Sequence, residues 1–169
     1  MPDKISARIP IVTFIGKSNS GKTTLLVKVI PELKKRGYRI ASIKHTHHNV
    51  TIDKEGKDSW RHREAGSEIV GLLSGNTLSM VRDFPEEPDI EFVRDRYIEG
   101  VDIVLAEGFK WTSVPKIWVF RKENCDSVIK KDDSLIAVIS DDKVDIGVPW
   151  IDINDIDGVA DFVEEKFLK

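Results

Sequence analysis

Apolar residues cluster into short runs that alternate along the chain with segments of helical spacing. Short apolar runs bounded by turn residues are typical of strands buried on both faces of a parallel sheet. The predicted strands of this kind cover residues 9–15, 39–44, 101–108, 116–121, 135–140 and 150–153. Apolar positions recur at helical spacing over residues 25–33, 90–97 and 159–167. This alternation predicts one α/β domain over residues 1–169, with a mostly parallel sheet and helices on both faces.

Proline, glycine and serine mark where the helices bend, stop and start. Pro31 is expected to bend the first helix without breaking it, because the proline ring clashes with the preceding turn. Gly37 is predicted to stop the same helix. Ser59 is predicted to cap a short helix over residues 60–65, which Gly66 ends.

One pair of runs departs from this alternation. Residues 67–74 and 77–82 have strand composition and are joined by Gly75-Asn76, a two-residue hairpin signal. The pair predicts an antiparallel hairpin at an edge of the sheet, where unpaired backbone groups are open to another chain. A dimer contact at this hairpin is a hypothesis.

The first predicted strand leads into a glycine-rich segment with the P-loop pattern G-x-x-x-x-G-K-T. Gly16 and Gly21 let the backbone bring its N–H groups close to an anion at the positive end of a helix dipole. Lys22 is expected to act on the β- and γ-phosphates as a catalytic cation, and Thr23 to complete a Mg²⁺ shell. The spacing excludes the dinucleotide pattern G-x-G-x-x-G. The predicted nucleotide contacts are Gly16, Lys17, Ser18, Asn19, Ser20, Gly21, Lys22, Thr23 and Thr24.

Two acids are candidates for the metal and for the attacking water. Glu107 ends the apolar run over residues 101–108, where P-loop proteins hold the Mg²⁺ water shell or polarise water. Asp53 lies in a polar loop over residues 49–59, where such proteins often place a switch segment that orders around the γ-phosphate and Mg²⁺. The alternatives are a solvent-facing carboxylate at Glu107 and a solvated charge run around Asp53.

A third acid is a candidate for base selection. Asp141 follows the predicted strand over residues 135–140. A carboxylate there could accept hydrogen bonds from guanine N1–H and the 2-amino group, whereas adenine offers no matching pair of donors. The usual N-K-x-D signature of GTPases is absent, and an ordinary loop aspartate is the alternative.

Three histidines, His45, His47 and His48, follow the second predicted strand and raise a metal hypothesis. No cysteine lies near them, and a third ligand would have to be His48 from the opposite side or Asp53. A polar loop mouth beside a phosphate site is therefore the favoured interpretation.

Composition narrows the class of protein. The formal net charge of −3 argues against a broad nucleic-acid footprint, which would show as a basic domain. Cys125 is the only cysteine, so an intrachain disulfide is impossible and a reducing cytoplasm is the expected setting. No apolar run approaches the roughly 20 residues of a membrane span. We therefore expect a cytoplasmic protein that uses neither a membrane nor a nucleic acid as partner.

Several segments together resemble the MobB family of molybdopterin-guanine dinucleotide biosynthesis adapter proteins. The segments that carry the resemblance are residues 16–24, 44–48, 53–59, Arg63 with Ala65-Gly66, 107–110 and 152–155. The resemblance implies GTP and Mg²⁺ binding, weak GTPase activity and a homodimer. It also implies assistance to the guanylyltransferase MobA, with molybdopterin-bearing proteins as further partners. Lys17 matches the second-position lysine that some dimeric P-loop ATPases direct at the partner's phosphates, with a solvent-facing lysine as the alternative.

Two other functions remain open from the residues. No arginine finger in cis or water-orienting glutamine is identifiable, so hydrolysis is expected to be slow. A small-molecule kinase could use the same loop, with an arginine-bearing lid drawn from Arg61, Arg63, Arg94 and Arg96. A non-hydrolysing interaction module could hold phosphate or a pterin pyrophosphate structurally.

Overall fold

The computed structural model describes residues 8–46, 54–124 and 132–169. The chain divides into two compact units, of which the larger comprises Met1–His45 with Asp89–Lys169 and the smaller comprises Thr46–Pro88. A division of contacts does not test whether each unit folds alone, so a single domain over residues 1–169 stays a prediction.

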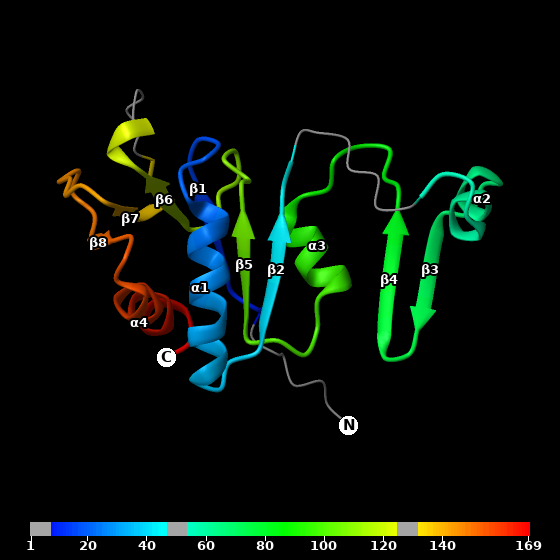
Figure 1. Cartoon of the computed structure of the whole chain (residues 1–169), viewed down its shortest axis with the longest axis horizontal. Helices are drawn as coiled ribbons and strands as arrows, with labels where there is room; N and C mark the ends of the chain where they lie inside the picture. Colours follow the sequence, from blue (N-terminus) through cyan, green and yellow to red (C-terminus); the bar gives the residue numbers. More distant parts are fainter. Residues whose placement is uncertain (1–7, 47–53, 125–131) are drawn as a thin grey trace. The chain divides into compact units, whose positions relative to one another are not determined.

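Six parallel strands form the sheet of the larger unit, in the order β2-β5-β1-β6-β7-β8 (Figure 1). Every predicted strand of this sheet is present within one or two residues of its expected ends. The strands are β1 (Ile11–Ile15), β2 (Ile40–Lys44), β5 (Ile103–Glu107), β6 (Lys116–Phe120), β7 (Leu135–Ser140) and β8 (Trp150–Asp152). The buried runs are nearly all apolar because helices or loops cover both faces of the sheet.

Helices cover both faces of the sheet, as the sequence predicts. Helices α1 (Lys22–Lys35) and α4 (Ile156–Phe167) pack side by side on one face. Helix α3 (Ile90–Tyr97) places Ile90 against the other face, and η1 (Lys122–Asn124) follows β6. A short loop joins β1 to α1, and both elements pack in the same apolar core, so the two ends of this loop are fixed in place.

The first helix is continuous through Pro31, as expected of a bend rather than a break. It ends at Lys35, and Gly37 follows with φ of 96°, the left-handed conformation that commonly terminates helices.

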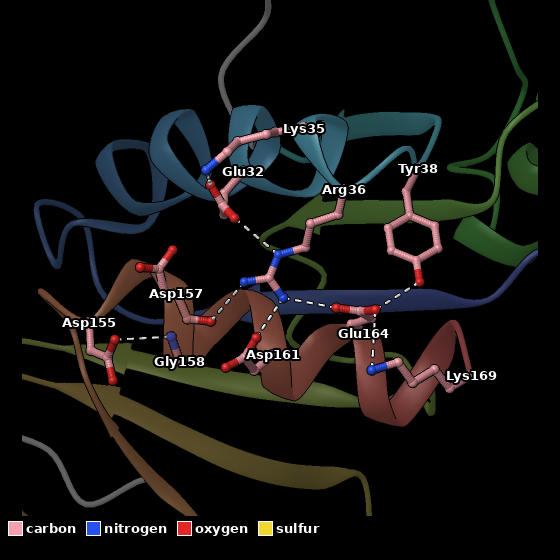
Figure 2. A network of polar contacts seen from close by, with 10 residues as sticks. All are labelled: Glu32, Lys35, Arg36, Tyr38, Asp155, Asp157, Gly158, Asp161, Glu164 and Lys169. Atoms are coloured by element: carbon pink, nitrogen blue, oxygen red, sulfur yellow. Dashed lines mark hydrogen bonds and ion pairs between the residues drawn. The ribbon is translucent and has the colours of Figure 1, made fainter.

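A polar network joins α1 to α4 at the end of α1 remote from the loop (Figure 2). The Arg36 guanidinium donates to Glu32 (3.0 Å), Asp161 (2.6 Å) and Glu164 (2.8 Å). The Tyr38 hydroxyl also donates to Glu164 (3.0 Å). Because these bonds connect two helices packed on the same face, the network stabilises the fold and lies outside the site.

The smaller unit contains α2 (Asp58–Glu64), β3 (Ile69–Ser74) and β4 (Thr77–Arg82). The predicted hairpin is present, but it forms a separate two-stranded sheet and does not extend the six-stranded one. The predicted cap at Ser59 is wrong, because α2 begins at Asp58 after Lys57 and has no side-chain cap bond. Among residues 8–46, 54–124 and 132–169, no helix has the length and apolar character needed to cross a bilayer.

Candidate functional site

Parallel pairing brings the carboxyl ends of the strands to one edge of the sheet. At the centre of that edge, β1 leads into residues 16–23, called the glycine loop below, and α1 follows. Strand β5 flanks β1 on one side and ends at Glu107, while β6 flanks it on the other and is followed by Arg121. Clefts at the carboxyl ends of parallel strands are the usual ligand sites of open α/β sheets.

The glycine loop has a backbone that side chains would disturb. Gly16 has φ of 154°, and a Cβ there would collide with the Val119 carbonyl oxygen. Gly21 has φ of 95° and Asn19 φ of 62°, both in the left-handed region. These conformations turn the loop back on itself ahead of the positive end of α1, which is the physical basis of anion binding by such loops.

The Lys22 ammonium lies inside this loop. It donates to the Gly16 carbonyl (3.0 Å), the Lys17 carbonyl (2.6 Å) and the Ser20 hydroxyl (3.4 Å). Burial lowers the pKa of Lys22, and Lys110 and Lys44 lower it further, while the Glu107 carboxylate opposes the shift. The charge is thus held at the centre of the loop by carbonyl oxygens.

Glu107 lies beside the glycine loop, at the end of β5. The Thr23 hydroxyl lies 2.9 Å and 2.7 Å from the two oxygens of the Glu107 carboxylate, and the Lys44 ammonium lies 3.4 Å from one of them. The fold therefore brings Thr23 and Glu107 together from positions 84 residues apart, as the metal hypothesis requires. A hydroxyl beside a carboxylate is an oxygen donor set suited to Mg²⁺ and its water shell.

Asp141 lies beyond the other side of the loop, at the end of β7. Its carboxylate accepts the Lys122 backbone N–H (2.8 Å) and lies 3.6 Å from Arg121 Nη1. Its role in base selection stays a prediction.

Sequence reasoning overlooked Arg121, which the fold brings against the glycine loop. A Cβ at Gly21 would lie 3.4 Å from Arg121 Nε. Its position in the sequence could have identified it. Arg121 is the first residue after a buried strand, and that strand ends at the same edge of the sheet as the glycine loop. Such positions merit attention even when the residue belongs to no recognised motif.

The histidine and switch hypotheses fall largely outside the described residues. His47, His48 and Asp53 all lie there, so their predicted roles are untested. His45 is described: its ring packs against Phe109, with centroids 5.0 Å apart, where Gly108 leaves room for it. Within the described part of the chain, no group of three or more His, Cys, Asp or Glu could hold a metal ion.

The remaining candidates have varied surroundings. Lys17, Ser18, Asn19, Thr23 and Thr24 are exposed, whereas Ser20 is buried. Among the arginines considered for a kinase lid, Arg61 and Arg63 lie in the smaller unit, where Arg63 pairs with Asp83 at 2.6 Å. Arg94 is buried on α3 and pairs with Asp95 at 2.7 Å. These contacts give the lid hypothesis no support.

Known proteins similar to this chain converge on one family. The model of MobB, molybdopterin guanine dinucleotide synthesis protein B, matches residues 11–141. A molybdopterin-guanine dinucleotide biosynthesis adapter protein of Escherichia coli (strain K12) is 41% identical over 166 residues, covering 95% of both chains. The protein of the same description from Haemophilus influenzae is 40% identical over 158 residues, covering 93% of this chain and 89% of the relative.

A solved structure shares the overall fold of this chain. A crystal structure of molybdopterin-guanine biosynthesis protein B matches with a TM-score of 0.76 and 30% identity, covering 94% of this chain and 99% of that one. The chain therefore has the P-loop NTPase-like fold that the glycine spacing predicts.

Proposed function

The chain belongs to the MobB family, and from that membership we propose that it is a Mg²⁺- and GTP-binding adapter in molybdopterin-guanine dinucleotide biosynthesis. The adapter role follows the family. GTP, the metal and the identity of the partner are our proposals, and they rest on the chemistry of the glycine loop.

One observation carries the nucleotide proposal: Lys22 and the Thr23–Glu107 pair lie together at the carboxyl edge of β1 and β5. An ammonium surrounded by loop carbonyls is placed to neutralise phosphate oxygens. A hydroxyl and a carboxylate in contact are placed to hold Mg²⁺ or its water ligands. Neither arrangement is needed to stabilise the sheet, whose core is apolar.

The residues fit Mg²⁺, with Thr23 as the direct oxygen donor and Glu107 as the acceptor for its bound waters. When bound, the ion would neutralise charge that develops between the β- and γ-phosphates. Glu107 would also orient an attacking water. The sequence contains no glutamine, so the usual glutamine that positions water is missing, and we propose slow turnover.

Calorimetry with GTP, ATP and Mg²⁺ tests the binding proposal directly. We expect Lys22→Ala to abolish triphosphate binding, since Lys22 supplies the charge at the centre of the loop. Lys28→Ala is the matched control, because Lys28 is an exposed lysine on the same helix. An unchanged titration for Lys22→Ala would remove the glycine loop from nucleotide binding.

The partner proposal is that the chain assists a molybdopterin guanylyltransferase of the MobA type in the cytoplasm. Guanylyl transfer by that enzyme should rise when this chain and GTP are added, and Lys22→Ala should not produce the rise. Equal stimulation by Lys22→Ala would separate the adapter role from nucleotide binding.

We also propose a homodimer through the hairpin. Alternation along β3 and β4 places four exposed apolar residues on one face, with Leu73 directly opposite Leu78. The four are Ile69, Leu73, Leu78 and Met80. A contiguous exposed apolar face of this kind often marks a contact with another chain, and a second copy would bury it.

Light scattering tests this dimer contact. Leu73→Glu should yield monomer, because it places a charge directly opposite Leu78 on the apolar face. Ser79→Glu, on the opposite face of the same hairpin, should remain dimeric. A dimer that survives Leu73→Glu would place the contact elsewhere.

A further inference from the structure

The sheet order gives the glycine loop two chemically different sides. On the β5 side, Thr23 meets Glu107, and Lys44 pairs with the same carboxylate. This is the side suited to the metal and the terminal phosphates. On the β6 side, Arg121 pairs with Asp141.

Arg121 lies against the start of α1. A Cβ at Gly21 would lie 3.4 Å from Arg121 Nε and 3.8 Å from Nη2, which are van der Waals distances, so the guanidinium lies directly against the loop. The Ile153 side chain would be equally near, with Cδ1 at 3.4 Å. Arg121 therefore lies beside the loop backbone at Gly21, immediately before α1 begins at Lys22.

The Arg121 and Asp141 side chains hold each other in place. Arg121 Nη1 lies 3.6 Å from Asp141 Oδ2, while Oδ1 accepts the Lys122 backbone N–H at 2.8 Å. The pair is still open to a ligand, since the side chains are 38% and 29% exposed. Each carboxylate oxygen keeps a lone pair for a further donor.

We propose that Arg121 binds the nucleoside end of GTP and orients Asp141 toward the guanine base, an inference that rests on the proposed function. Since Lys22 and Glu107 mark the phosphate and metal side, the nucleoside extends toward β6 and β7, where this pair lies. The planar guanidinium offers a stacking surface for a purine. The oriented Asp141 carboxylate accepts guanine N1–H and the 2-amino group, a pair of donors that adenine lacks.

Titration of GTP, ATP and inorganic tripolyphosphate into the full chain separates the nucleoside end from the phosphates. Arg121→Ala should weaken GTP by about 10- to 100-fold, the range of losing a stacked base, and bring GTP and ATP affinities together. Its tripolyphosphate affinity should stay within about twofold of wild type. Arg121→Lys should lose as much GTP affinity as Arg121→Ala, because lysine keeps the charge but has no planar group.

Lys122→Ala is the matched control, since its side chain pairs with Asp142 (3.0 Å) and the variant keeps the backbone N–H that Asp141 accepts. Its GTP affinity should equal that of wild type, and melting curves should match for all variants. Equal losses of GTP and tripolyphosphate in Arg121→Ala, or full GTP affinity in Arg121→Lys, would overturn the inference. The inference would also be overturned if the wild-type protein bound GTP no more tightly than tripolyphosphate. If the wild-type protein bound neither ligand, the proposed function itself would be refuted.

Discussion

Replacing Glu107 with glutamine should remove the tightening of nucleotide binding that Mg²⁺ is expected to produce. The carboxylate is the acid that contacts Thr23 and Lys44, and its charge opposes the lowering of the Lys22 pKa. Glutamine keeps the size and one oxygen but removes the charge. The free loop then becomes more positive, which favours GTP without metal and disfavours Mg²⁺.

The structure bounds the size of this effect. A unit charge about 4 Å from another contributes roughly 4 kcal/mol at an effective dielectric constant of about 20. The Glu107 side chain is only 12% exposed, which favours a strong electrostatic effect. The Lys44 side chain is 60% exposed, so solvent screens part of the interaction between the two charges. Loss of an outer-shell metal partner typically weakens metal binding by about 10- to 100-fold, and we expect a loss in that range.

Calorimetry of GTP with excess Mg²⁺ and with EDTA measures both halves of the prediction. Glu107→Gln should bind GTP at least as tightly as wild type in EDTA and should lose the tightening that Mg²⁺ produces, with slower turnover. Asp142→Asn is the control, because it removes a charge at the same sheet edge from a residue paired with Lys122. Unchanged Mg²⁺ dependence in Glu107→Gln would return Glu107 to a structural role.

Three further outcomes are expected. GTP affinity should fall as pH rises toward the pKa of Lys22, which burial lowers below its ordinary value of 10.5, because binding needs the ammonium; a calorimetric profile that stays flat through that ordinary value would contradict this. Asp141→Asn should weaken GTP more than ATP in competition titrations, and equal losses would exclude base selection. Arg36→Ala should lower the melting temperature by a few degrees at neutral pH. Hydrogen bonds from Arg36 lower the pKa of Glu32 and Glu164, so the wild-type protein should lose the associated stability as pH falls below about 4.5. The melting temperature of Arg36→Ala should depend less on pH in this range.

The local pattern predicted the six-stranded sheet well for a physical reason. A strand covered on both faces must be apolar along its whole length, so β1 or β7 is recognisable from its own residues. The hairpin was recognisable too, because Gly75-Asn76 constrains a two-residue turn. Which sheet a hairpin joins depends on residues far away in the chain, and this is where the expected edge position failed.

The site shows the same division between local and long-range information. The glycine loop is one continuous segment whose spacing carries its chemistry, so Gly16 to Thr23 could be identified from sequence. The contact of Thr23 with Glu107 joins segments 84 residues apart in the chain, yet an acid at the end of a buried strand made it predictable. Arg121 belongs to no motif. It lies near Gly21 because β1 and β6 are adjacent parallel strands, and this pairing cannot be read from the local sequence.

The polar groups of the glycine loop bond to one another, and this shapes how tightly the loop would hold GTP. Lys22 donates to loop carbonyls, and Thr23 donates to Glu107. The proposed binding of GTP would exchange these contacts for contacts with phosphate and metal, so the net gain would be smaller than the sum of the new bonds. A loop of this kind suits an adapter that takes up GTP and releases it to a partner. Tight storage would instead require donors that are pre-oriented and without competing acceptors.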